Sequence, residues 1–293
     1  MEQNYKILKV GLIAIGITIC FTALFGYYCK LDNPVFFKQY CEYYLPMEDN
    51  NDYGEFFYLQ YVTNVNDNRE VVSISFDEAP ELLFYANENR NNNWFVTNSN
   101  DKKGQIYGRY SVRTVNVQIN KLQIEDINKE YRVSKANVMF NNGENMVVDL
   151  GDICFYTPEI SDEYLETNMS SSSNTGLSKT SFRIKQDITV ESLNSPLMQY
   201  VENLVDIRVG ETDYTSISGM QFSKGDTLNI DSLFNMPKDI ESQFTFYNIK
   251  PVLKYKNKNG NMSSTRIYNI NYIPTYDMNF YRLFMYLKAR GEI

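Results

Sequence analysis

The sequence predicts a mainly β protein, with a single N-terminal transmembrane helix followed by one or two β-sandwich-like extracytoplasmic domains and a few short helices. Three observations lead to this prediction. One uncharged apolar segment lies near the N-terminus. Apolar and polar residues alternate with a period of two in many later segments, and Asn-Gly pairs mark tight turns between them.

The segment from Val10 to Cys29 carries no charged side chain. As a helix it would extend about 30 Å, which is the thickness of the hydrocarbon core of a bilayer. Lys6 and Lys9 precede it, and the aromatic pair Tyr27-Tyr28 stands at its far end, which is typical of a cytoplasmic basic flank and an interfacial aromatic belt. We therefore expect a single-pass protein of the cell membrane, with a cytoplasmic N-terminus and the lipid bilayer as the partner of this segment.

Two other interpretations of the apolar segment are a cleaved signal peptide and a bacterial lipoprotein signal. The segment is longer than a usual signal core, and Ala23-Leu24-Phe25 is a poor cleavage site because Phe25 is large. A lipid-modified cysteine normally follows a small residue, whereas Cys20 follows Ile19 and Cys29 follows Tyr28. Both observations favour a permanent anchor.

Composition narrows the function. The chain has 293 residues and a formal net charge of −8, so nucleic acid, which requires a basic surface, is excluded as an expected partner. It contains no histidine, which excludes Ser-His-Asp and Cys-His catalysis as well as histidine-containing zinc sites. Cys41 and Cys154, beyond the span, either pair or remain buried thiols. The sequence assigns no catalytic, cofactor-binding or metal-ligating residue, and no cofactor is expected.

We predict seven segments in chain order. They are a cytoplasmic tail (1–9), the transmembrane helix (10–29), a juxtamembrane helix and acidic loop (30–54), a first β-sandwich-like domain (55–160), a Ser-rich linker (161–179), a second β-rich domain (180–276) and a C-terminal amphipathic helix (277–293). An extended loop inside one larger domain is the alternative to the linker.

The juxtamembrane helix is predicted at 33–45, because Asn33 is a suitable N-cap, Pro34 suits the first turn and Pro46 ends the run. The acidic stretch 49–54 approaches a calcium-binding loop, although Tyr53 stands where an oxygen ligand is needed, and a solvated loop is the simpler interpretation.

Strands of the first domain are predicted from period-two alternation and the turn at Asn142-Gly143, which we expect to be of type I′. They are 56–62, 71–76, 82–85, 94–97, 105–110, 112–119, 133–140 and 146–156. Trp94 follows an Asn-rich loop, where an exposed ring could stack on a sugar, but a core position is the stronger interpretation.

The second half is predicted to be mainly β with one helix, which starts at Asn194-Ser195-Pro196 and has apolar residues at helical spacing as far as Leu204. Its predicted strands are 181–184, 205–209, 214–222, 227–230, 244–247, 252–256 and 265–273, with a second hairpin turn at Asn259-Gly260. In the last segment, Phe280, Leu283, Phe284 and Leu287 have helical spacing, and we expect this face to dock on the second domain.

These features favour a non-catalytic binding or structural module of the cell envelope, whose partner would be an unidentified envelope or membrane protein. One alternative is a hydrolase that uses two carboxylates, such as the cluster Asp149, Asp152, Glu159 and Asp162. Another is an accessory subunit of a membrane transport or secretion complex, because Gly11, Gly16, Thr18 and Thr22 give the span a small or polar surface.

Overall fold

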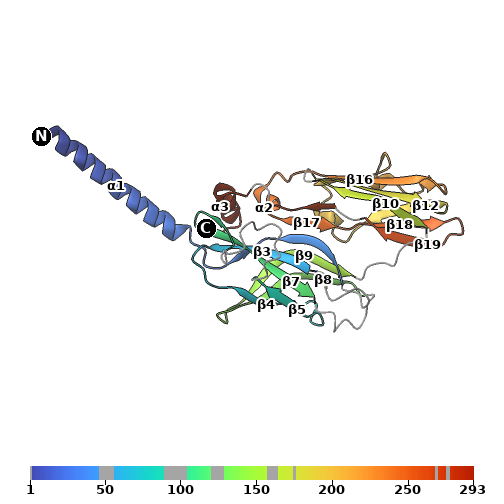
Figure 1. The fold of residues 1–293 in the computed structure, drawn as a ribbon, viewed down its shortest axis with the longest axis horizontal. Helices are drawn as coiled ribbons and strands as arrows, with labels where there is room; N and C mark the ends of the chain where they lie inside the picture. The colour runs from blue at the N-terminus through green and yellow to red at the C-terminus, as the bar shows by residue number, and fades with distance from the viewer. Residues whose placement is uncertain are drawn as a thin grey trace.

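The computed structural model describes residues 2–45, 56–88, 104–119, 129–156, 164–173, 176–267, 270–274 and 278–293. Helix α1 (Glu2–Tyr28) extends away from a body built mainly of strands (Figure 1). Its segment Leu8–Tyr28, of 21 residues, is long and apolar enough to cross a membrane by length and composition, and it is not buried against the body. The mainly β fold with one N-terminal apolar helix is therefore confirmed.

The described strands form four sheets, A to D. Sheet A contains β1 (Val35–Phe36), β3 (Phe56–Asn64), β5 (Phe84–Asn87), β6 (Gln105–Tyr107) and β7 (Tyr110–Ile119). Sheet B contains β2 (Gln39–Tyr44), β4 (Val71–Ser75), β8 (Tyr131–Phe140), β9 (Asn145–Tyr156), β17 (Phe246–Ile249) and β20 (Ile270–Tyr272).

Sheet C contains β10 (Leu165–Ser172), β11 (Leu177–Ile184), β13 (Val205–Val209), β14 (Thr212–Asp213) and β16 (Thr227–Phe234). Sheet D contains β12 (Ile188–Asn194), β15 (Gln221–Phe222), β18 (Val252–Asn257) and β19 (Met262–Arg266). The described helices after α1 are short: η2 (Met198–Tyr200), η3 (Tyr214–Ser216), α2 (Ile240–Gln243) and α3 (Phe280–Ala289).

Sheet B is the central layer of the body. Its strand order is β20-β17-β2-β9-β8-β4, and β2 pairs in parallel with both β9 and β17. Alternate residues of β9 belong to different cores: Ile153 and Phe155 pack with sheet A, whereas Cys154 packs with sheets C and D. Because successive side chains of a strand point to opposite faces, sheet B separates two sandwich-like cores. The division into two domains stays a prediction, and sheet B draws strands from both predicted domains.

The juxtamembrane helix predicted at 33–45 is wrong, because this segment forms β1 and β2. Strand β2 is buried between two cores, so both of its faces carry apolar or aromatic residues. A strand buried on both faces has no clear alternation and cannot be distinguished from a helix by periodicity. The acidic loop that follows lies outside the described residues.

The Ser-rich linker predicted at 161–179 is also corrected, because its described part contains strand β10 and the start of β11. The two strands pair in an antiparallel hairpin, and β10 is the edge of sheet C. Every residue of β10 after Leu165 is exposed. An exposed edge strand buries little side chain, so its composition resembles that of a loop.

Both Asn-Gly pairs lie in hairpin turns, as predicted, but the turn type differs from expectation. Gly143 N donates to the carbonyl of Phe140 and Gly260 N to that of Asn257, with φ angles of 85° and 82° at the two glycines. This is a three-residue loop with glycine in the left-handed position rather than a two-residue I′ turn. The helix predicted from Asn194 is reduced to the single 3₁₀ turn η2.

The two cysteines beyond the span are free and buried. In the parallel register Cys41 lies opposite Ile153, and Cys154 lies opposite Glu42. Paired residues of neighbouring strands point to the same face, so Cys41 and Cys154 point to opposite faces of sheet B. Burial raises the pKa of both thiols to about 12. A disulfide between them would require one strand to turn over.

Candidate functional site

The candidate site is the junction at which the apolar helix enters the body. Arg109 and Tyr110, which are adjacent in the sequence, both bind backbone carbonyls at the end of α1. Arg109 donates from Nη1 to the carbonyl of Phe25 at 3.0 Å, and the Tyr110 hydroxyl donates to the carbonyl of Cys29 at 2.7 Å. The Phe25 carbonyl also accepts from Cys29 N at 3.0 Å, so Arg109 is a second donor to it, whereas Tyr110 binds the carbonyl of the residue that follows the helix. Both bonds attach the helix end to the body.

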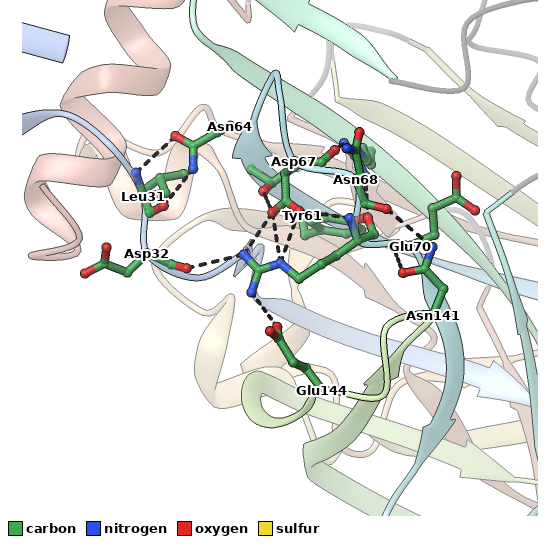
Figure 2. Close-up of polar contacts among 12 residues, drawn as sticks. Leu31, Asp32, Tyr61, Asn64, Asp67, Asn68, Glu70, Asn141 and Glu144 are labelled. Carbon is green, nitrogen blue, oxygen red and sulfur yellow. Dashed lines mark hydrogen bonds and ion pairs between the residues drawn. The ribbon is translucent and has the colours of Figure 1, made fainter. Parts of the chain in front are cut away.

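Asn64, at the end of β3, holds the chain immediately after the helix. Its side-chain amide accepts from Leu31 N at 3.1 Å and donates to Leu31 O at 2.6 Å, as Figure 2 shows. Leu31 is itself buried with Val35, Phe37 and other residues in a third core cluster below the junction. The connection from helix to body is thus short, hydrogen-bonded and packed.

Asp67 and Arg69 form a charged group beside this connection (Figure 2). The Arg69 guanidinium binds Asp67 at 2.8 Å and Glu144 at 3.0 Å, and it donates to the carbonyl of Asp32 at 3.3 Å. Burial alone would raise the pKa of Asp67, but hydrogen bonds from Arg69 and Thr63 lower it to about 2. This group links the chain after α1 to the β3–β4 and β8–β9 turns.

Helix α3 packs at the same junction, where Figure 1 places it beside the body end of α1. Its N-cap Asn279 accepts from Arg282 N, and its buried face, with Leu283, Tyr286 and Leu287, lies in the third core cluster. That cluster combines residues from sheet A, from the start of the chain and from the second half, so α3 docks on the junction rather than on the predicted second domain alone.

The other face of α3 meets α1. The rings of Phe25 and Phe284 stack with centroids 6.0 Å apart, and Phe280 stacks on Tyr110 at 6.0 Å. Gly108 allows this approach, because a Cβ added there would lie 2.8 Å from the Phe280 ring. The helix end is therefore in contact with polar groups on one side and with an aromatic row on the other.

A second polar cluster lies in the centre of the body, around Glu42 of β2. Glu42 is fully buried, accepts from the Ser195 hydroxyl and accepts from Lys250 N at 3.0 Å. Arg266 approaches its carboxylate at 3.7 Å, and the Arg266 guanidinium stacks on the Tyr156 ring at 3.5 Å. These partners come from three separate segments of the second half of the chain, so Glu42 ties β2 to that half.

Burial raises the pKa of Glu42 above its ordinary value of 4.5, whereas the hydrogen bonds and the nearby cations oppose this change. Raised carboxyl pKa values are common at catalytic sites, but they also arise in buried structural networks. Each oxygen of Glu42 already has a hydrogen-bond donor, and the side chain has no exposed surface. This geometry suits a structural tie better than an acid or base.

The two described carboxylates considered for a hydrolase are each bound by other side chains. Asp149 is paired with Lys38 at 3.2 Å, whereas Asp152 is buried and bound by Arg132 and by the Tyr200 hydroxyl. Glu159 and Asp162 lie outside the described residues, as do the calcium-like stretch 49–54 and Trp94. Within the described ranges, no group of three or more His, Cys, Asp or Glu side chains could hold a metal ion.

Sequence reasoning missed the residues that build the junction and the Glu42 cluster. Arg109 and Tyr110 lie more than 80 positions from their acceptors, and Ser195 lies 153 positions from Glu42. A side chain at such a distance leaves no periodic signal. A charged residue within the apolar run of β2 was the one visible sign, because a lone Glu among buried residues requires partners.

Comparisons with known proteins give no family. No protein-family model matches the chain, and no curated protein matches it. Among solved structures, the E. coli chaperone DraB is 9% identical, covers 80% of this chain and 95% of its own length, and has a TM-score of 0.23. The fibronectin(III)-like modules of Clostridium thermocellum CbhA are 8% identical, cover 85% of this chain and 97% of theirs, and have a TM-score of 0.17.

Proposed function

We propose that this chain is a single-pass membrane protein that holds a non-catalytic β body in a fixed pose at the outer surface of the cell membrane, as a binding or structural module of the envelope. The observation that carries this proposal is the junction. Asn64, Arg109 and Tyr110 bind the backbone at and just after the helix end, so the body follows the helix directly. A domain that only needed tethering would not require such attachment.

The span supports lipid contact rather than a polar helix partner. Thr18 and Thr22, the polar side chains considered for helix pairing, donate to the carbonyls of Ala14 and Thr18 within the same helix. Their hydroxyls are satisfied without a second chain, which suits a lipid-facing surface. The lysines before the span and the aromatic pair after it support a cytoplasmic N-terminus.

A non-catalytic role is supported by the state of the buried carboxylates. Glu42 and Asp152 are each held by several donors from other strands, and those contacts explain their burial without a substrate. The binding surface is not assigned, because no described feature identifies a partner.

Membrane topology is tested by labelling cysteine variants with a membrane-impermeant maleimide in intact cells. In a background with Cys20 and Cys29 replaced by serine, Ser172→Cys on the exposed edge of sheet C should react, whereas Gln3→Cys should react only after permeabilisation. The buried Cys41 and Cys154 should not react with the maleimide in intact or in permeabilised cells. Labelling of Gln3→Cys but not Ser172→Cys in intact cells would reverse the orientation, and release of the Ser172→Cys protein by a salt wash would refute the anchor.

A further inference from the structure

Helix α3 has two faces, and its second face is apolar as well as exposed. Tyr281 and Met285 lie on the side of the helix opposite the buried Leu283 and Leu287, and Phe280 and Phe284 lie between the two sides. Tyr281 is 68% exposed, and Phe280 and Met285 are each exposed by more than a third. Phe280 and Phe284 stack on Tyr110 and Phe25, so Tyr281 and Met285 are the apolar residues of this side that project away from the body.

The position of this face along α1 identifies what covers it. The span Leu8–Tyr28 has 21 residues, which reach about 31 Å as a helix and so are all needed to cross a hydrocarbon core of about 30 Å. Phe25 is three residues from the end, about 5 Å inside the boundary by the same rise per residue. Because Phe284 stacks on Phe25, α3 must lie at the boundary between hydrocarbon and headgroups.

The chemistry of the face fits that position. Aromatic rings with polar tips prefer the headgroup region, and Tyr27 and Tyr28 of α1 are exposed at the same level. Lys288 follows Phe284 by one turn on the same face, where its long side chain can bring the ammonium group to lipid phosphates.

From this geometry we propose that α3 is an interfacial membrane helix, whose exposed Tyr281 and Met285 insert into the acyl boundary beside the end of α1. This inference rests on the proposed membrane anchoring. With two attachment points, the span and α3, the body is prevented from tilting about the helix end. The buried face of α3 meanwhile remains docked in the third core cluster.

The test is quenching of tryptophan fluorescence by brominated lipid, with the full chain in phosphatidylcholine nanodiscs whose acyl chains carry bromine at shallow positions. The background is Trp94→Phe, and single tryptophans are introduced as Tyr281→Trp or Met285→Trp on α3. Met262→Trp on β19, at the end of the body away from α1 (Figure 1), is the matched control because Met262 is also highly exposed. Leu24→Trp reports on the span.

We expect both α3 variants to lose emission in brominated relative to unbrominated nanodiscs, whereas Met262→Trp keeps its emission. If Leu24→Trp is quenched but both α3 variants match Met262→Trp, the span is in lipid and the α3 proposal is wrong. If Leu24→Trp is not quenched either, the span is not in lipid and the anchoring proposal itself is wrong. Protection of the α3 tryptophans from aqueous acrylamide without quenching by bromine would show a protein partner instead, and would also overturn the proposal.

Discussion

Asp67 and Glu42 are both carboxylates with little exposed surface, yet their environments change their pKa values in opposite directions. Asp67 lies at the junction with the apolar helix and has a guanidinium bound directly to it, so its pKa is held at about 2. Glu42 lies in the centre of the body, where Arg266 is farther away and neutral donors predominate, so burial raises its pKa. The comparison shows that a guanidinium bound directly to a carboxylate can outweigh the effect of partial burial, whereas deeper burial with a more distant cation raises the pKa.

The largest effect is expected for Glu42→Ala. Removing the carboxylate takes away the acceptor of the Ser195 hydroxyl and of Lys250 N and the carboxylate nearest to Arg266, and breaking such a buried network costs about 3–5 kcal/mol. Urea unfolding of the full chain in nanodiscs measures this loss. Glu42→Gln is the matched control, because it keeps one acceptor oxygen and the volume of the side chain. Equal losses for the two variants would mean that neither the volume nor one remaining acceptor oxygen holds β2 in place, and that both carboxylate oxygens are required.

At the junction, Asp67→Ala is expected to cost less, about 1–3 kcal/mol, because the site is open enough for water to reach Arg69. The control is Glu144→Gln, which removes the exposed partner of the same guanidinium and should cost at most about 1 kcal/mol. Thermal unfolding of the two variants side by side gives the ranking. A larger loss for Glu144→Gln than for Asp67→Ala would show that Glu144, and not Asp67, is the main partner of Arg69.

The opposite pKa changes predict opposite dependence on pH. Asp67 stabilises the fold above its ordinary pKa of 3.8, and this contribution disappears as pH falls through about 2. The raised pKa of Glu42 means that the folded state binds its proton more tightly, so its contribution decreases as pH rises above 4.5.

These signs are checked by the free energy of unfolding of the wild type, Asp67→Asn and Glu42→Gln, measured from acid to neutral pH. The stability difference between wild type and Asp67→Asn should be largest above pH 3.8 and should close toward pH 2. Glu42→Gln should gain on the wild type as pH rises above 4.5. Parallel curves for all three proteins would contradict the assignment of both groups.

A small effect on global stability is expected for Tyr110→Phe, which removes one hydroxyl and its bond to the Cys29 carbonyl. The loss should be about 0.5–1.5 kcal/mol, and the ring keeps its stacking on Phe280. Hydrogen exchange should nevertheless accelerate at the amides around Lys30, because the helix end has lost one attachment. Unchanged exchange there would show that the tyrosine does not hold the helix end.

The sequence was sufficient where a local pattern decided the structure. The uncharged run of α1, the alternation of β7 and the two Asn-Gly turns each predicted the element that formed, and residues 205–209 were predicted with the bounds of β13. Prediction from the sequence failed where burial on both faces or strand pairing determined the structure of a segment. Strand β2 is apolar on both faces because sheet B lies between two cores, and β10 is polar because one edge of it is unpaired.

The junction could not be predicted for a different reason. Its bonds join Asn64 to Leu31, and Arg109 to Phe25, and only the pairing of β3 with β7 brings those residues to one end of the body. The amphipathic spacing of α3 was visible, but its exposed aromatic face gained meaning only once Phe284 was placed against Phe25. Long-range contacts of this kind depend on the complete topology.

The central claim, that the body is fixed to the span rather than tethered, is tested most directly by the distance distribution between two spin labels in nanodiscs. The labels are placed at Ile13→Cys in α1 and Ser172→Cys in β10, with Cys20 and Cys29 replaced by serine. The account predicts one narrow distribution that broadens when Arg109→Ala and Tyr110→Phe are combined. A broad distribution in the unmodified junction, or one that the two substitutions leave unchanged, would contradict it.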